Sequence, residues 1–301
     1  NDSDCDGQPD VVTFEKLAYA DHTLPENQDC IAEGVCITRA EMRGLFNAAV
    51  EEAHNYYGSS PALLAFSRGY VGAVDEDAYT RWVEAIYSGT WWAYQPMAMR
   101  LTEEERYFNV VAYRWSTHDS GGGFAWARSE VKHFEKPSFA DGSDPANQDC
   151  LAPSVCLARG ASQSLYNAAV ESGSSTGSPA GTEWAPMPTA RAKASDYTTF
   201  NAAVSNSPQS MIGQVLSLHV VGTSIYYDIV LTAFTNQAEG AGFAYHRSRA
   251  IVIGCTDSSA ANYDARANVD DGFCGDWVRV TIPDEADTTL PENQDCLSET
   301  V

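Results

Sequence analysis

The stretch Leu24-Pro25-Glu26-Asn27-Gln28-Asp29-Cys30 decides how this chain is organised, because it recurs. A second copy, DPANQDC, spans residues 144–150, and a third, LPENQDC, spans residues 290–296. The first two copies lie 120 residues apart, and the sequence between them aligns with the sequence after the second. Self-similarity at a fixed period is a sign of repeat architecture. The sequence therefore predicts an array of homologous modules.

Composition limits the classes of partner. The chain has 301 residues, of which 41 are acidic and 18 basic, and its formal net charge is −23. So acidic a surface argues against nucleic-acid and anionic-membrane partners, and it suits divalent cations, high-salt water or simple solubility. Hydrophobic residues make up 44%, enough for each module to bury its own core. No apolar run is long enough for a membrane span.

Short alternating segments predict β-strands, the clearest being 12–16, 96–101, 107–115 and 124–128. Residues 44–51 fit a helix or a β-hairpin, and we favour the hairpin because Gly160 and Ser162 stand where a helix would start in the second copy. Residues 75–86 predict a helix, with one face made of Tyr79, Trp82, Val83 and Ile86. The fold class predicted is mainly β, with two homologous β-sandwich or jelly-roll-like modules in tandem and a short disulfide-stapled acidic loop.

The duplication sets the expected boundaries. They are 1–11 for the tail of a preceding acidic loop, 12–132 for β module A, 133–253 for β module B, 254–275 for the acidic loop, and 276–301 for the start of another module A. Aromatic positions correspond between the copies, with Trp115 matched by Phe234 and Trp126 by Tyr245, the interchange expected of core positions.

Eight cysteines predict a disulfide framework. Cys30 and Cys36 recur as Cys150 and Cys156, and a further pair brackets an acidic loop at Cys255 and Cys274. Repeated pairs with few histidines indicate disulfides in an oxidising compartment, whereas zinc needs CxxC-type spacing or nearby histidines. Cys5 and Cys296 are left over, and we expect that the sequence is a window cut from a longer repetitive chain.

The acidic loop is the best candidate for a ligand site. Hard cations such as calcium bind several oxygens in a constrained loop, and this one offers Asp257, Asn262, Asp264, Asp270 and Asp271. The alternative is a disulfide-stapled linker without metal. A second acidic segment, containing Asp2, Asp4 and Asp6, matches a calcium loop or the tail of a preceding 255–274-type loop; we favour the tail, and calcium fits either.

These residues carry two resemblances. The segment Asp2 to Asp10 resembles a thrombospondin type 3 repeat. Residues 254–274, with GCTD, NYD and DDGFC, resemble the GCTD-type repeat of large secreted bacterial surface proteins, and the modules, with SPAGTEW at 178–184, resemble unannotated β-modules of about 120 residues in secreted proteins of aquatic bacteria. The resemblance implies an extracellular or cell-surface location and assigns no activity.

No catalytic constellation stands out. None of the six histidines falls at a matched position or beside a nucleophile motif, so we expect surface histidines and no enzyme. Trp91 and Trp92 have no aromatic counterpart in module B and are the candidate ligand-contact aromatics. We expect a structural repeat of an extracellular filament, stalk or adhesin shaft, whose edge strands, such as 12–16 and 277–282, pair with neighbouring copies. The alternative is a carbohydrate-binding region that recognises polysaccharide.

Overall fold

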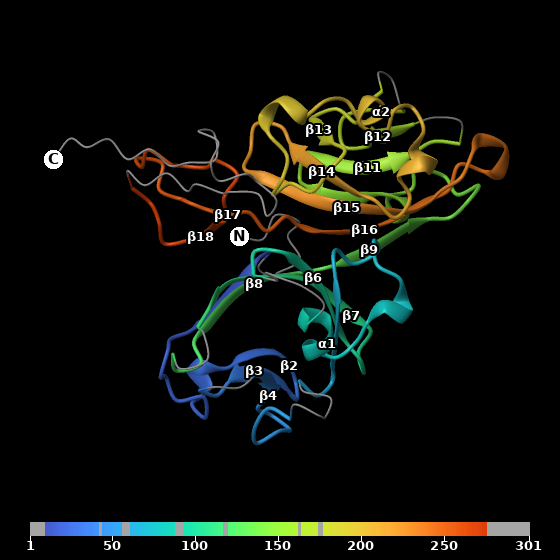
Figure 1. Ribbon diagram of the computed structural model, residues 1–301. Helices are drawn as coiled ribbons and strands as arrows, with labels where there is room; N and C mark the ends of the chain where they lie inside the picture. The colour runs from blue at the N-terminus through green and yellow to red at the C-terminus, as the bar shows by residue number, and fades with distance from the viewer. Residues whose placement is uncertain are drawn as a thin grey trace, which may run out of the picture.

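The computed structural model describes residues 10–41, 44–55, 61–87, 93–116, 120–161, 164–173 and 177–275. The chain folds mainly into antiparallel β-strands, as its alternating pattern predicts (Figure 1). In the first half, a five-stranded sheet has the order β1-β8-β7-β6-β5, with β1 (Val12–Lys16), β5 (Leu64–Arg68), β6 (Pro96–Leu101), β7 (Arg106–Trp115) and β8 (Phe124–Glu130). A three-stranded sheet contains β2 (Asp29–Ala32), β3 (Val35–Arg39) and β4 (Leu45–Asn47).

The two sheets of the first half enclose one apolar core. Ile37 and Leu45 from the small sheet pack with Met99, Phe108 and Trp126 from the large one, and all five are almost fully buried. Alternate residues of β7 point into this core, as the period of two in a strand requires. The first half is therefore a β-sandwich whose small sheet covers one face of the large sheet.

The second half repeats this strand order. Its large sheet has the order β9-β16-β15-β14-β13, with β9 (Lys132–Lys136), β13 (Thr182–Ala185), β14 (Val215–Val220), β15 (Ile225–Phe234) and β16 (Phe243–Arg249). Its small sheet contains β10 (Asp149–Ala152), β11 (Val155–Arg159) and β12 (Leu165–Asn167). The core again lies between the sheets and includes Leu157, Trp184, Tyr227 and Tyr245.

Short helices connect the strands. The α-helices are α1 (Trp82–Tyr87) and α2 (Phe200–Ala203). The 3-10 turns are η1 (Pro25–Asn27), η2 (Glu76–Ala78), η3 (Pro145–Asn147), η4 (Ala194–Asp196), η5 (Pro208–Met211) and η6 (Gln237–Glu239). The helix predicted over 75–86 is wrong in its first part, because Thr80 is extended there and exchanges backbone hydrogen bonds with Phe66. The hairpin favoured for 44–51 is present, since β4 pairs with β3.

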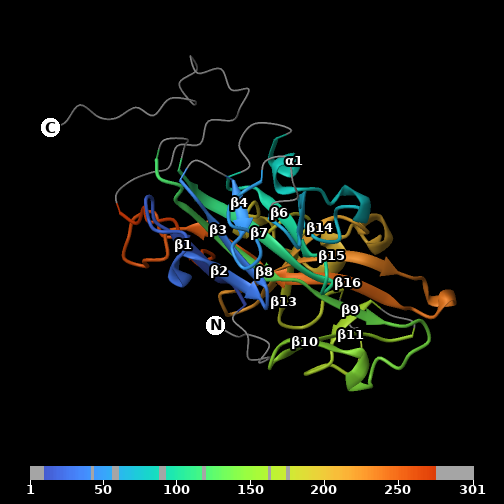
Figure 2. The same ribbon diagram turned by 90° about the horizontal axis from the view of Figure 1, so that it is seen from below.

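The two large sheets meet through the faces that point away from their own small sheets. Asn109 of β7 donates from Nδ2 to Oγ of Ser248 on β16 at 2.9 Å, and this contact is buried. Only Val131 separates β8 from β9, so the chain passes directly from one large sheet into the other. Figure 1 shows the small sheet β2–β4 on the side of the first half that faces away from the second, and Figure 2 shows it nearest the viewer from below.

The acidic loop lies against the first half. It is closed by a parallel pair of two-residue strands, β17 (Ile253–Gly254) and β18 (Val269–Asp270). Ile251 and Val269 pack on the outer face of β7 and β8, against Val111, Ala125 and Ala127. Within the described ranges, no helix is long and apolar enough to cross a membrane. Residues 276–301, expected to start a further module, lie outside the described residues.

Candidate functional site

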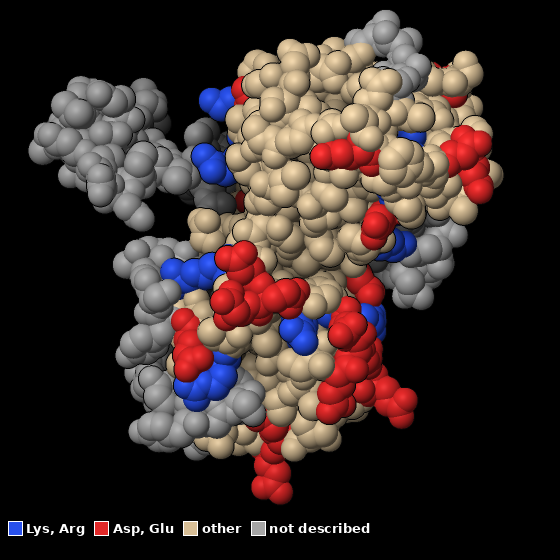
Figure 3. All heavy atoms as spheres, turned by 90° about the vertical axis from the view of Figure 1, so that its right-hand side faces the viewer, with Lys and Arg blue, Asp and Glu red and all other residues tan. Residues whose placement is uncertain are grey.

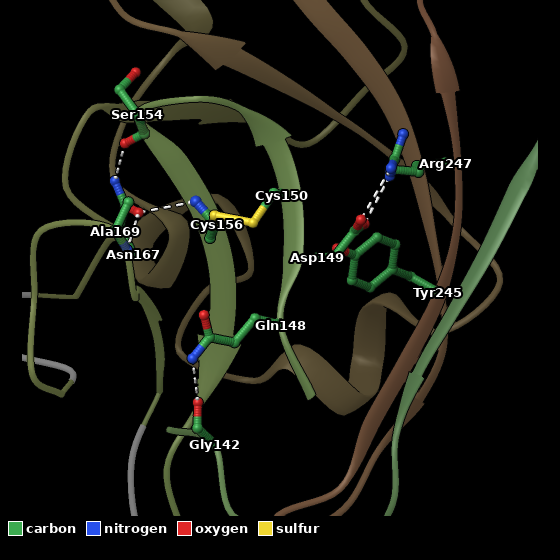
Figure 4. Close-up of a disulfide and its surroundings, with 10 residues drawn as sticks. All are labelled: Gly142, Gln148, Asp149, Cys150, Ser154, Cys156, Asn167, Ala169, Tyr245 and Arg247. Atoms are coloured by element: carbon green, nitrogen blue, oxygen red, sulfur yellow. Dashed lines mark hydrogen bonds and ion pairs between the residues drawn. A yellow bond between two sulfur atoms is a disulfide. The ribbon is translucent and has the colours of Figure 1, made fainter. Parts of the chain in front are cut away.

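Disulfides staple the small sheets and the acidic loop. Cys30 bonds Cys36, Cys150 bonds Cys156, and Cys255 bonds Cys274, which are the three pairs expected from the sequence. The first two lie across directly opposed positions of the hairpins β2–β3 and β10–β11. Figure 4 shows the Cys150–Cys156 bond and its surroundings. Three disulfides in one chain indicate an oxidising environment. Cys5 and Cys296 lie outside the described residues.

The residue before each first cysteine forms a buried ion pair with the large sheet. Asp29 accepts from Nε and Nη2 of Arg128 at 3.0 and 2.9 Å, and from the Trp126 indole at 2.8 Å. Such bidentate pairs are the stronger kind of hydrogen-bonded contact. The Asp of the repeated sequence Asn-Gln-Asp-Cys therefore ties the small sheet to the large one.

The second half has an equivalent buried ion pair. Asp149 accepts from Nε and Nη2 of Arg247 at 2.6 and 2.9 Å, and from the Tyr245 hydroxyl at 2.7 Å (Figure 4). The indole of Trp126 and the phenol of Tyr245 thus donate to the carboxylate from matched places. These positions, predicted to be core, are buried, and each also has this polar role.

A buried asparagine supports each hairpin. Asn167 accepts from the backbone of Cys156 and Ala169, and it donates to the carbonyl oxygens of Ser154 and Ala180. Asn47 makes the same four kinds of contact in the first half. Because buried amides cost free energy unless they are bonded, this full use of the side chain marks Asn47 and Asn167 as structural.

The predicted calcium ligands are engaged in local contacts. Asp257, Asp270 and Asp271 each accept backbone N–H groups two residues ahead, Asp264 binds Arg266 at 2.8 Å, and Asn262 bonds the backbone of Phe273 and Gly275. The described part of the chain holds no group of three or more His, Cys, Asp or Glu that could bind a metal ion. Calcium in this loop stays a prediction, which a thermal melt with and without EGTA tests.

Asp2, Asp4 and Asp6, and the pair Trp91 and Trp92, lie outside the described residues.

Among the histidines that the structure describes, His54 departs most from the expected surface position. His54 is buried, with Nδ1 2.8 Å from the Leu45 carbonyl oxygen, so the expectation of surface histidines is wrong there. The imidazole fills the space that the missing side chain of Gly44 leaves open, because an added Cβ at Gly44 would lie 2.8 Å from it.

Each half exposes one aromatic side chain, and the two occupy equivalent positions. Tyr19 is 72% exposed and Phe139 is 78% exposed, and both have positive φ, +62° and +66°. Their amides donate to the carbonyl oxygens of Gly121 and Gly240, whose own positive φ and close approach exclude a side chain. Bulky residues rarely adopt this backbone conformation, which costs roughly 1–2 kcal/mol each. The sequence contains a signal for this pair, an aromatic residue three positions after the Lys of each Phe-Glu-Lys.

A pocket of about 330 Å³ opens at the junction between the halves. Its wall contains the cations Arg106, Arg128, Lys132, Arg247 and Arg249. It also contains the carboxylates Asp10 and Glu130 and the rings of Phe108 and Tyr227. These residues are dispersed over 240 positions of sequence, so no local motif could have predicted the pocket.

The carboxyl group of Asp228 is buried at the junction between the two halves. Asp228 of β15 accepts from the backbone N–H and the hydroxyl of Thr189, both at 2.8 Å. Burial raises the pKa of Asp228 to about 6, against the opposing effect of those hydrogen bonds. Tyr70 of the first half lies near it, and its phenol pKa is raised by burial and by the Asp228 charge. The corresponding position of the first half holds the neutral Asn109, which accepts from the Val71 amide.

No protein-family model, curated protein or solved structure matches this chain.

Proposed function

We propose that the chain is a structural repeat unit of an extracellular assembly, such as a filament, a stalk or an adhesin shaft, and has no catalytic role. The observation that carries the proposal is that the buried polar contacts present in both halves hold sheets together. The Asp–Arg pair, the cross-strand disulfide and the bonded asparagine each occur once per half, and each joins strands. Residues that occur in both halves and hold strands together favour a structural function for the protein.

The means of assembly would be strand pairing between copies. β1 and β9 are edge strands of the two large sheets. An edge strand has backbone donors and acceptors that a neighbouring chain can satisfy. At the opposite edges, β5 and β13 are bridged by the chain's own Thr80 and Thr198. We therefore assign the contact between copies to the edge of the first large sheet that strand β1 forms.

Sedimentation velocity over a range of concentrations tests this assignment. The purified chain should associate as concentration rises, and Thr13→Lys on β1 should weaken association by roughly tenfold, because a charged side chain on an edge disfavours pairing. Thr102→Lys is the matched control, since it places the same charge in an exposed turn between β6 and β7. A monomer at every concentration, or equal association of both variants, would contradict the proposal.

A second candidate function is polysaccharide binding, and Tyr19 and Phe139 favour it. Exposed aromatic rings present an apolar face with a polar surround, the arrangement that suits a sugar ring. A positive φ alone does not demand an aromatic residue, because the first half has Tyr94 at positive φ where the second half has Gly213. At 19 and 139, by contrast, both copies place an aromatic ring in a strained conformation that exposes it.

Retention on insoluble cellulose, chitin and agarose tests this second candidate. The variant carrying Tyr19→Ala and Phe139→Ala should lose roughly tenfold in retention, whereas Tyr94→Ala, at the partly exposed Tyr94, should behave as the unchanged chain. Failure of the unchanged chain to bind any of the three materials, or equal retention of the double variant, would reject it.

A further inference from the structure

We propose that a buried lysine in each half, Lys16 or Lys136, positions the exposed ring of Tyr19 or Phe139 for contact with a polysaccharide. The inference rests on the second candidate function, and it names the groups that would set the geometry of that site. It begins from two costly features that occur together. In each half a lysine that is only 2% or 1% exposed comes three residues before an exposed aromatic residue with positive φ.

The buried lysines have no carboxylate to balance their charge. Within the described part of the chain, the Lys16 ammonium reaches only the carbonyl oxygens of Leu17 and Gly122, at 3.5 and 3.4 Å. Burial and the charge of Arg39 lower the pKa of Lys16, and burial likewise lowers the pKa of Lys136. A buried cation without an ion-pair partner costs free energy. Because these lysines do not favour stability, their presence in both halves indicates another role.

In the first half, the lysine binds the turn on which the aromatic residue rests. The glycine carbonyl oxygens at 121–123 accept in order from the Tyr19 amide at 2.7 Å, the Lys16 ammonium at 3.4 Å and the Arg39 guanidinium at 3.1 Å. Lys16 also reaches the carbonyl oxygen of Leu17, which lies between Lys16 and Tyr19 in the chain. The ammonium therefore links the segment that carries the ring to the glycine turn.

The second half has the same arrangement. The carbonyl oxygens at 240–242 accept in order from the Phe139 amide at 2.8 Å, the Lys136 ammonium at 3.4 Å and the Arg159 guanidinium at 2.8 Å. Lys136 also reaches the carbonyl oxygen of the next residue at 3.3 Å. A ring on a fixed backbone loses less freedom when it binds a ligand. The lysines are therefore positioning residues, which would act on a polysaccharide through the rings.

The third copy of the repeated sequence changes both positions together. When it is aligned on LPENQDC, Lys16 corresponds to Ile282 and Tyr19 corresponds to Glu285. The sequence that lacks the aromatic residue thus also lacks the lysine. This joint change is expected if the lysine serves the ring.

Limited proteolysis of the whole chain tests the positioning. Chymotrypsin cuts after aromatic residues, and it needs a mobile backbone to do so. The double variant Lys16→Met with Lys136→Met should be cut after Tyr19 and Phe139 roughly tenfold faster than the unchanged chain, because the local opening of these segments becomes easier. Mass spectrometry identifies the bonds that are cut. Lys193→Met is the matched control, because it makes the same change at an exposed lysine.

Urea unfolding of the same variants separates positioning from a structural role. The double variant should be at least as stable as the unchanged chain, because it removes two buried charges. Lower stability without faster cleavage after Tyr19 and Phe139 would show that the lysines only support the fold, and it would overturn the proposal. Cleavage at the rate of Lys193→Met would also overturn it.

Retention on cellulose, chitin and agarose links the positioning to the ligand. On a material that retains the unchanged chain, the double lysine variant should lose roughly tenfold in retention, because its rings are no longer held in the binding geometry. Equal retention of the two chains would overturn the proposal. If none of the materials retains the unchanged chain, the second candidate function fails, and the cleavage rates alone decide whether the lysines position the rings.

Discussion

At the scale of single residues, Asp228 is the group whose burial has a measurable consequence. Its pKa is about 6 in the folded chain, above its ordinary 3.8, because burial disfavours the charged form. The folded state therefore holds this proton more tightly than the unfolded state, and stability falls as pH rises from about 4 to about 6. At neutral pH the penalty is roughly 3 kcal/mol.

We expect Asp228→Asn to remove this loss of stability, since Asn109 occupies the corresponding position of the first half. Urea unfolding at pH 4.5 and pH 7.5 measures it. The unchanged chain should lose stability relative to the variant between the two pH values, and parallel pH profiles would show that Asp228 is not responsible. Tyr70 and Tyr197 lie nearby, and because burial raises the pKa of both phenols, neither ionises over this range.

The disulfide pairs could be predicted from the sequence, whereas the burial of Asp228 could not. Repeated spacing predicted Cys30–Cys36 and Cys150–Cys156, because each pair lies on one hairpin, and the bracketing of the acidic loop predicted Cys255–Cys274. The burial of Asp228 could not be predicted, because the alternating pattern of residues 225–234 does not say that a second sheet covers the outer face. Asp228 is polar in a position that would be solvated in an isolated sandwich.

At the scale of elements, the Asp149–Arg247 pair joins β10 to β16. Asp149→Ala should destabilise the fold by about 3–5 kcal/mol, because it leaves a buried guanidinium without its carboxylate. The double variant Asp149→Ala with Arg247→Met should recover much of that loss. Chemical denaturation of the single and double variants measures the difference, and additive losses would show that the pair has no coupling.

Some secondary-structure elements could be predicted from the spacing of apolar residues, and others could not. Strands β1, β6, β7 and β8 follow alternation and were predicted within a few residues. The segment 75–86 has the apolar spacing of a helix, yet the edge of the large sheet offered Thr80 backbone partners, and the helix starts only at Trp82. Long-range pairing of this kind overrides local periodicity, and a single sequence does not contain it.

At the scale of the whole molecule, the two halves pack against each other through their large sheets. Their large sheets share buried contacts, such as Asn109 with Ser248, and the chain crosses between them through one residue. Acidic side chains gather over the first half on the face shown in Figure 3. The repeat predicted two similar modules, but their packing depends on the outer sheet faces, for which the sequence pattern has no separate signal.

Imaging of native material tests the central claim, that this chain is a structural unit of an extracellular assembly. Negative-stain electron microscopy of cell-surface material, labelled with an antibody raised against the purified chain, should show the label repeating along filaments or regular arrays. Label found only on separate, monodisperse particles would contradict the claim.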